Sequence, residues 1–141
     1  MQLLTLSAGC LFLLFFIGEF VGIQGFSRRP KARTMMWNIN MVFTVLWLAA
    51  ITLLLYGKTS GVVLTLVLSI LWVIAQIRAH WIPYILGAPI EYQREYQRIF
   101  KQTVSVLPRL TKRGVVPNLY HTLILILLFL TISSGLSVLV G

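Results

Sequence analysis

Long apolar stretches alternate with short polar segments along the chain, and four of the apolar stretches are long enough to cross a membrane. They cover residues 3–25, 36–56, 61–82 and 116–140. A helix rises 1.5 Å per residue, so the hydrocarbon core of a bilayer needs roughly 20 residues. We expect the third helix to end near residue 82, because Pro83 cannot continue helical hydrogen bonding. The pattern predicts an all-α polytopic membrane protein, with four transmembrane helices in one domain covering residues 1–141.

The composition excludes the soluble and the disordered classes of protein. Hydrophobic residues make up 58% of the chain, charged residues make up only 11%, and the mean hydropathy is +0.89. Ordinary soluble domains have about 25% charged residues. This chain therefore has too few charged side chains to cover a water-facing surface.

The basic residues predict how the chain is oriented in the membrane. All Lys and Arg residues except Lys58 lie in the first and third loops or just before the third. Because cytoplasmic loops carry an excess of Lys and Arg, we expect these loops to be cytoplasmic and both termini to lie outside. The compact form favours a bacterial inner membrane. We expect the charges to attract membrane lipids and not nucleic acid, because the topology already accounts for them.

Residues 89–107 are too polar to span the membrane and predict an amphipathic helix at its surface. Pro89 suits the first turn of a helix, and Pro108 would stop one. We expect the tyrosines on the apolar face to point toward the acyl chains. Two interpretations remain open: a connector that rests on the membrane, and a lid whose tyrosines gate a site in the bundle. The apolar face contains Tyr92, Tyr96, Ile99, Phe100, Thr103 and Leu107, and Tyr84 is a further candidate gate residue.

Polar side chains interrupt the apolar helices near their predicted cytoplasmic ends and form one layer in depth. An ionisable residue inside a membrane predicts a functional site, and the candidate partners of Glu19 are the arginine and the histidines of this layer. The structural alternatives are a Glu19–Arg78 ion pair and contact of Glu19 with interfacial water. A metal site is a weaker alternative, because no pair of ligands falls on one helical face. The layer consists of Glu19, Asn40, Gln76, Arg78, His80 and His121.

One face of the third predicted helix is polar. Thr65 and Ser69 fall at helical spacing with Gln76 and His80. Lipid cannot satisfy these groups, so we expect this face to point into the bundle.

The sequence excludes several catalytic arrangements. It contains no Asp, and therefore no Ser/His/Asp triad, and the P-loop and GxGxxG patterns are absent. We expect no cofactor and no metal. Gly18 and Gly22 form a GxxxG pattern, which predicts either a homo-oligomer contact or close packing within the same bundle.

The segment from His80 to His121 contains the most distinctive strings of the chain: HWIPYILGAP, EYQREYQRIF, LPRL and VPNLYH. These strings resemble a pattern in small, uncharacterised four-helix membrane proteins of bacteria. The resemblance covers under a third of the chain. It implies that the segment is a structural module, and it brings no activity and no catalytic residue.

Three classes of function are compatible with the polar layer. The leading hypothesis is a protein that binds, senses or transports a small amphiphile or ion near the cytoplasmic leaflet. The second is a small membrane enzyme acting on a lipid or isoprenoid, with Glu19, His80 or His121 as general acid or base. The third is an immunity-type or other partner protein that uses the GxxxG face.

Overall fold

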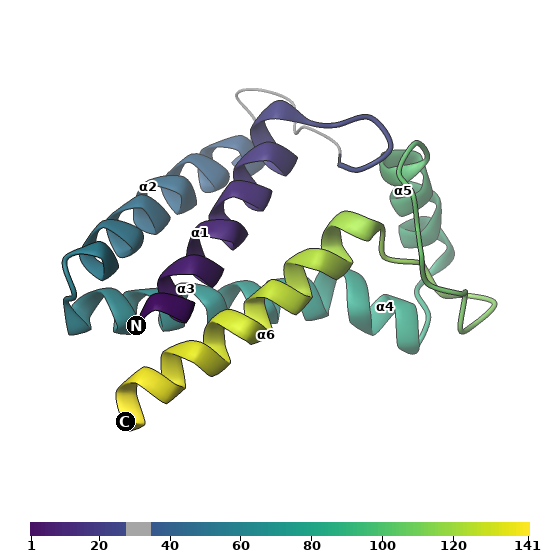
Figure 1. The fold of residues 1–141 in the computed structure, drawn as a ribbon. Helices are drawn as coiled ribbons and strands as arrows, with labels where there is room; N and C mark the ends of the chain where they lie inside the picture. The colour runs from purple at the N-terminus through teal and green to yellow at the C-terminus, as the bar shows by residue number, and fades with distance from the viewer. Residues whose placement is uncertain (28–34) are drawn as a thin grey trace.

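The computed structural model describes residues 1–27 and 35–141, and this part of the chain is helical with no β-strand. Four helical spans are long and apolar enough to cross a membrane, which confirms the predicted all-α polytopic fold (Figure 1). The protein is therefore an integral membrane protein. The spans are Gln2–Val21, Met35–Leu55, Thr59–Ile85 and Leu119–Val140.

The four spans form a ring in which each helix packs against two neighbours. α6 (Leu119–Val140) contacts α1 (Gln2–Phe16) and α3 (Thr59–Gln76), and α2 (Met35–Leu55) also contacts both of them. Apolar side chains fill the centre. The fully or almost fully buried ones include Leu4, Leu11, Trp47, Leu54, Val62, Ile124 and Leu128.

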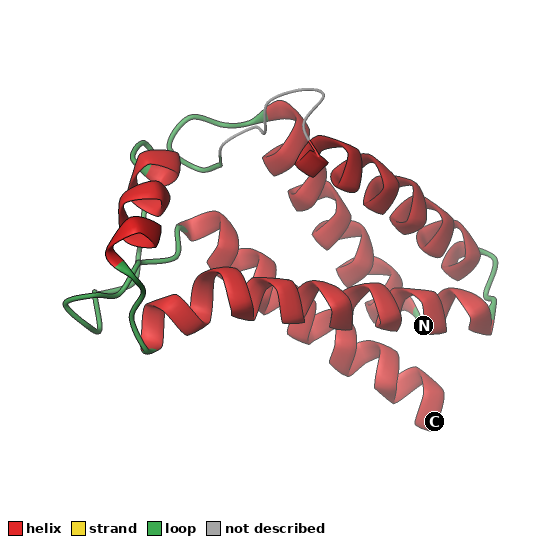
Figure 2. Ribbon diagram, turned by 180° about the vertical axis from the view of Figure 1, so that it is seen from behind, coloured by secondary structure: helices red, strands yellow, loops and turns green. Residues whose placement is uncertain are grey.

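The two ends of the bundle differ. Both termini and the short turn between α2 and α3 lie at one end, and α5 (Ile90–Phe100) lies across the other, which we call the α5 end (Figures 1 and 2). α2 and α3 meet at their connecting turn and diverge toward the α5 end. The basic residues Arg28, Arg29, Lys31 and Arg33 of the first loop lie outside the described residues.

The prediction that the third helix stops before Pro83 is wrong. A π-helical turn, η2 (Ile77–Trp81), follows α3, and the helix continues as α4 (Ile82–Ile85) with Pro83 in its first turn. Proline has no N–H to give to the carbonyl of Ala79, four residues earlier. The hydroxyl of Tyr92 on α5 donates to this carbonyl instead, so a neighbouring helix satisfies the group that proline leaves free.

The helix that the sequence predicts for residues 89–107 is shorter than expected: α5 ends at Phe100. The hydroxyl of Thr103 donates to the carbonyl of Phe100, and β-branched residues, which are weak helix formers, follow. The backbone of Val104 then donates to the carbonyl of Gly25 at 2.6 Å and accepts from the N–H of Leu119 at 2.8 Å. Residues 101–118 therefore form an irregular segment that ties the end of the first span to the start of α6.

Two further helix boundaries differ from the prediction. The first span ends at Val21, because Gly22 has a φ of 68° and cannot continue the helix. α6 begins at Leu119 and not at residue 116. The side chain of Asn118 caps it by accepting the N–H of His121 at 3.0 Å.

Candidate functional site

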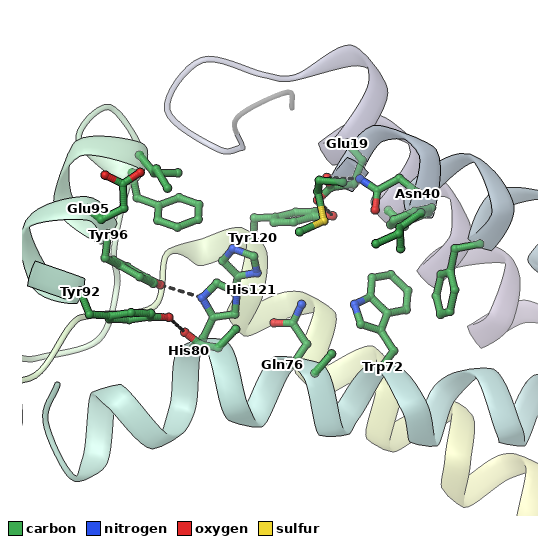
Figure 3. A pocket seen from close by; sticks show the side chains of 18 of the residues that line it. Glu19, Asn40, Trp72, Gln76, His80, Tyr92, Glu95, Tyr96, Tyr120 and His121 are labelled. Carbon is green, nitrogen blue, oxygen red and sulfur yellow. Dashed lines mark hydrogen bonds between the residues drawn. The ribbon is translucent and has the colours of Figure 1, made fainter. Parts of the chain in front are cut away.

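A cavity of about 1170 Å³ lies at the α5 end, between the diverging ends of α2 and α3. Residues of α5, of the first span and of α6 form its other walls (Figure 3). Met36 and Ile39 on α2 and Leu71 and Ala75 on α3 line the cavity and are exposed. The exposed part of the lining therefore includes an apolar rim between two membrane-spanning helices, in addition to Glu95 and Arg98 on α5.

The structure brings five of the six residues of the predicted polar layer to the wall of this cavity. They come from all four spans and are Glu19, Asn40, Gln76, His80 and His121. The polar face of α3 also points inward as predicted, since Thr65 and Ser69 are completely buried.

Arg78 does not belong to the cavity. It is exposed and lies outside the lining, because it is two residues away from both Gln76 and His80 and so points to the opposite side of the helix. The alternative of a Glu19–Arg78 ion pair is wrong, since the ion pair found among the described residues joins Arg98 and Glu95.

Glu19 connects three spans. It lies in a π-helical turn, η1 (Ile17–Val21), at the end of the first span. Its Oε2 accepts a hydrogen bond from Nδ2 of Asn40 at 2.8 Å, and its Oε1 accepts one from the hydroxyl of Tyr120 at 3.1 Å. Sequence reasoning missed Tyr120, because a tyrosine at the end of a transmembrane helix is ordinarily expected to face the lipid headgroups. The one indication of its role in the sequence is that Tyr120 directly precedes His121, a residue of the predicted polar layer.

The two histidines lie against each other in the cavity wall (Figure 3). The rings of His80 and His121 stack with their centroids 3.6 Å apart and an interplanar angle of 25°. Neither ring nitrogen of His121 has a hydrogen-bond partner within the described chain, and the same holds for Oε1 of Gln76. Buried polar atoms without partners are costly, so this wall has hydrogen-bonding capacity to offer a bound molecule.

The tyrosine face of α5 covers the histidines, and the expectation that it points to the acyl chains is wrong for Tyr96. This side chain is buried, and its hydroxyl lies 2.9 Å from Nδ1 of His80. Burial raises the pKa of Tyr96 above the ordinary phenol value, so its hydroxyl stays protonated and can donate to His80. Tyr92 lines the cavity and also bonds to α3 through the carbonyl of Ala79. α5 is therefore attached to the transmembrane bundle and forms one wall of the cavity.

Tyr84 has a different place from the other two candidate gate residues. It is buried, lies outside the cavity lining, and donates a hydrogen bond to the carbonyl of Pro108 at 2.9 Å. It connects α4 to the irregular segment 101–118.

Aromatic rings line the part of the cavity deepest in the bundle. Trp72 lies edge-to-face against Phe15 and Phe43, with centroid distances of 5.0 and 5.5 Å. All three rings belong to the cavity wall. Sequence reasoning missed them, because aromatic residues at helical spacing are more often plain core residues.

The GxxxG pattern does not form a continuous helix surface. A Cβ atom on Gly18 would come within 2.2 Å of the ring of Tyr120 in the same chain. Gly22 lies beyond the helix end. Gly18 thus serves packing within the bundle, and a homo-oligomer stays a prediction.

Across residues 1–27 and 35–141, no group of three or more His, Cys, Asp or Glu side chains is placed to hold a metal ion. The comparisons with protein-family models, curated proteins and solved structures found no match. Function is therefore inferred from the chemistry of the cavity.

Proposed function

We propose that the protein binds a small amphiphile in the cavity between α2 and α3, as a sensor or carrier of that molecule. The observation that supports this proposal is the combination of an exposed apolar rim between two spans and a polar wall. An amphiphile would place its tail between the exposed apolar residues of α2 and α3 and its head against Glu19, Gln76 and His121. Ligand sites are typically apolar with a few convergent polar groups, as here. A simple ion would enter from water and would not need an apolar rim between helices.

We further propose that the α5 end faces the cytoplasm of a bacterial cell and that both termini lie outside. The basic residues Arg94, Lys101, Arg109 and Lys112 at the α5 end support this orientation, with Lys58 at the opposite end. In a Cys10→Ser background, Lys58→Cys should react with a membrane-impermeant maleimide added to intact cells. Lys112→Cys should react only after the membrane is permeabilised, and the reverse pattern would contradict the orientation.

The binding proposal is tested by blocking the cavity without changing its polar groups. Ala75 lies in the cavity wall on α3, and Ala49 is an exposed alanine of α2 outside the lining. Native mass spectrometry of protein released from nanodiscs should detect a retained amphiphile in the wild type and in Ala49→Trp, and none in Ala75→Trp. Equal retention in both variants would contradict binding in this cavity. The same spectra report the stoichiometry, and hence the homo-oligomer that the sequence predicts.

A second candidate function is an enzyme that acts on a lipid held in the same cavity. The specific observation is that both ring nitrogens of the buried His121 have no partner among the described residues. An imidazole in this state could act as a general acid or base. Turnover of an added lipid that His121→Gln abolishes, while the lipid is still retained in native mass spectra, would establish the enzyme.

A further inference from the structure

The charges of the cavity wall favour a positively charged ligand. Two carboxylates, Glu19 and Glu95, and one guanidinium, Arg98, line the cavity. Arg98 forms an ion pair with Glu95 at the exposed edge. In the described part of the chain Glu19 has hydrogen-bond donors, Asn40 and Tyr120, and is in no ion pair. Among the described residues, therefore, no basic side chain neutralises a carboxylate at this position.

The hydrogen-bonding groups of the wall point to the same class of ligand. Each carboxylate oxygen of Glu19 accepts one hydrogen bond and has a further lone pair, and Oε1 of Gln76 accepts none. Binding a phosphate or carboxylate head normally requires Arg, Lys or several N–H donors. The one Lys or Arg of the described residues in the lining is Arg98, which is exposed on α5 and paired with Glu95. The wall is therefore suited to a head that donates hydrogen bonds or carries positive charge.

The aromatic rings provide a second, independent attraction for a cation. Phe15 lies one helical turn before Glu19, and its ring contacts those of Phe43 and Trp72 at 6.0 and 5.0 Å. A cation over an aromatic ring is attracted by the ring's quadrupole, and the attraction is larger where water is excluded. A cavity lined by a carboxylate and several aromatic rings can bind the charge and the apolar groups of an organic cation together.

The apolar rim between α2 and α3 also fits this ligand. The basic residues Arg94, Lys101, Arg109 and Lys112 at the α5 end would repel a cation arriving from water, within a Debye length of about 8–10 Å. An amphiphilic cation that has already partitioned into the bilayer would instead enter between Met36 and Ile39 on α2 and Ala75 on α3. The bilayer concentrates such molecules, since its anionic lipids attract positive charge.

We infer that the ligand of the cavity is an amphiphilic organic cation, an amine or quaternary onium carrying apolar groups, with Glu19 as its counter-ion. This inference rests on the proposed binding function and names the class of ligand. Glu19 binds the charge, the rings of Phe15, Phe43 and Trp72 contact the apolar groups around it, and α5 covers the site.

Two ions of the same shape and opposite charge test the inference. Equilibrium dialysis of the full chain in dodecyl maltoside would measure binding of tetraphenylphosphonium and of tetraphenylborate, with empty micelles as background. We expect tetraphenylphosphonium to bind at least tenfold more tightly than tetraphenylborate. Glu19→Gln, which keeps the size of the side chain and one oxygen that can accept a hydrogen bond from Tyr120 or Asn40, should weaken cation binding at least tenfold. Glu91→Gln removes the same charge from an exposed position outside the cavity and should leave binding unchanged.

A second variant tests the inference independently, in case Glu19→Gln does not fold. Phe43→Leu keeps an apolar side chain and removes a ring face, so it should weaken binding of the cation and leave binding of tetraphenylborate unchanged. Equal binding of the two ions, or full cation binding by Glu19→Gln, would overturn the inference. If the amphiphile excluded by Ala75→Trp proves to be neutral or anionic, the binding function holds and the cation inference falls. If Ala75→Trp excludes nothing, both fall.

Discussion

Gly18→Ala should disturb the bundle and the site together, because Gly18 is packed against Tyr120. An added Cβ would lie 2.2 Å from Cε2 and 2.5 Å from Cζ of that ring, far inside van der Waals contact. Tyr120 is almost completely buried and donates to Glu19, so it cannot move aside without losing that bond. Overpacking of this kind costs about 1–3 kcal/mol. A lost hydrogen bond in a membrane protein adds about 0.6 kcal/mol.

Gly9→Ala is the matched control, because Gly9 lies in the same membrane span and has no atom within 4 Å of its added Cβ. Both variants gain helix propensity, up to about 1 kcal/mol, so the difference between them isolates the steric cost. Unfolding in mixed dodecyl maltoside and SDS micelles, followed by circular dichroism, should show Gly18→Ala less stable than Gly9→Ala by about 1.5–3.5 kcal/mol. Equal stabilities would refute the packing argument. A difference that depends on protein concentration would instead favour an oligomer contact at Gly18.

Three further predictions concern the capping residue and the α5 wall. Asn118→Ala should destabilise the protein by about 0.5–2 kcal/mol in the same unfolding assay, because it removes the cap on the His121 N–H, while Asn118→Ser should retain most of the stability. Tyr96→Phe should speed amide hydrogen exchange in α5, because it removes the bond to His80, whereas Tyr56→Phe at the exposed α2–α3 turn should not. Burial raises the pKa of Tyr96, so the stability that its neutral hydroxyl contributes is present below about pH 10 and is lost as the pH rises above that value. The wild type should therefore lose more stability than Tyr96→Phe between about pH 9 and pH 11. Equal losses of stability in the two proteins would contradict this prediction.

The sequence predicted the fold well because each span must be apolar over a fixed length. The same requirement makes a polar residue inside a span conspicuous, so the sequence alone identifies Glu19, Asn40 and Gln76, which line the cavity. Errors arose where local backbone chemistry decides. The helix continues past Pro83 because of a π-helical turn and a hydroxyl from Tyr92, which no periodicity indicates.

The sequence did not predict how the polar residues are paired. Depth along a helix can be counted, but the direction of a side chain depends on the packing of the whole bundle. Arg78 belongs to the polar layer by its position along the helix, but its side chain faces outward. Tyr120 has no role in the sequence-based prediction, but its hydroxyl donates a hydrogen bond to Glu19. The cavity itself arises from the divergence of α2 and α3, which depends on the packing of all four spans.

The most direct test of the central claim, that an amphiphile binds between α2 and α3, is photo-crosslinking in nanodiscs. The probes are a long-chain alkylamine and a long-chain alcohol, each with a diazirine in its chain, so that the result does not depend on the charge of the ligand, and labelled residues are mapped by tandem mass spectrometry. We expect labelling of Met36, Ile39 and Ala75 that saturates and is displaced by excess unlabelled amphiphile. Labelling spread evenly over the lipid-facing sides of α1 and α6, with no displacement by the competitor, would contradict the claim.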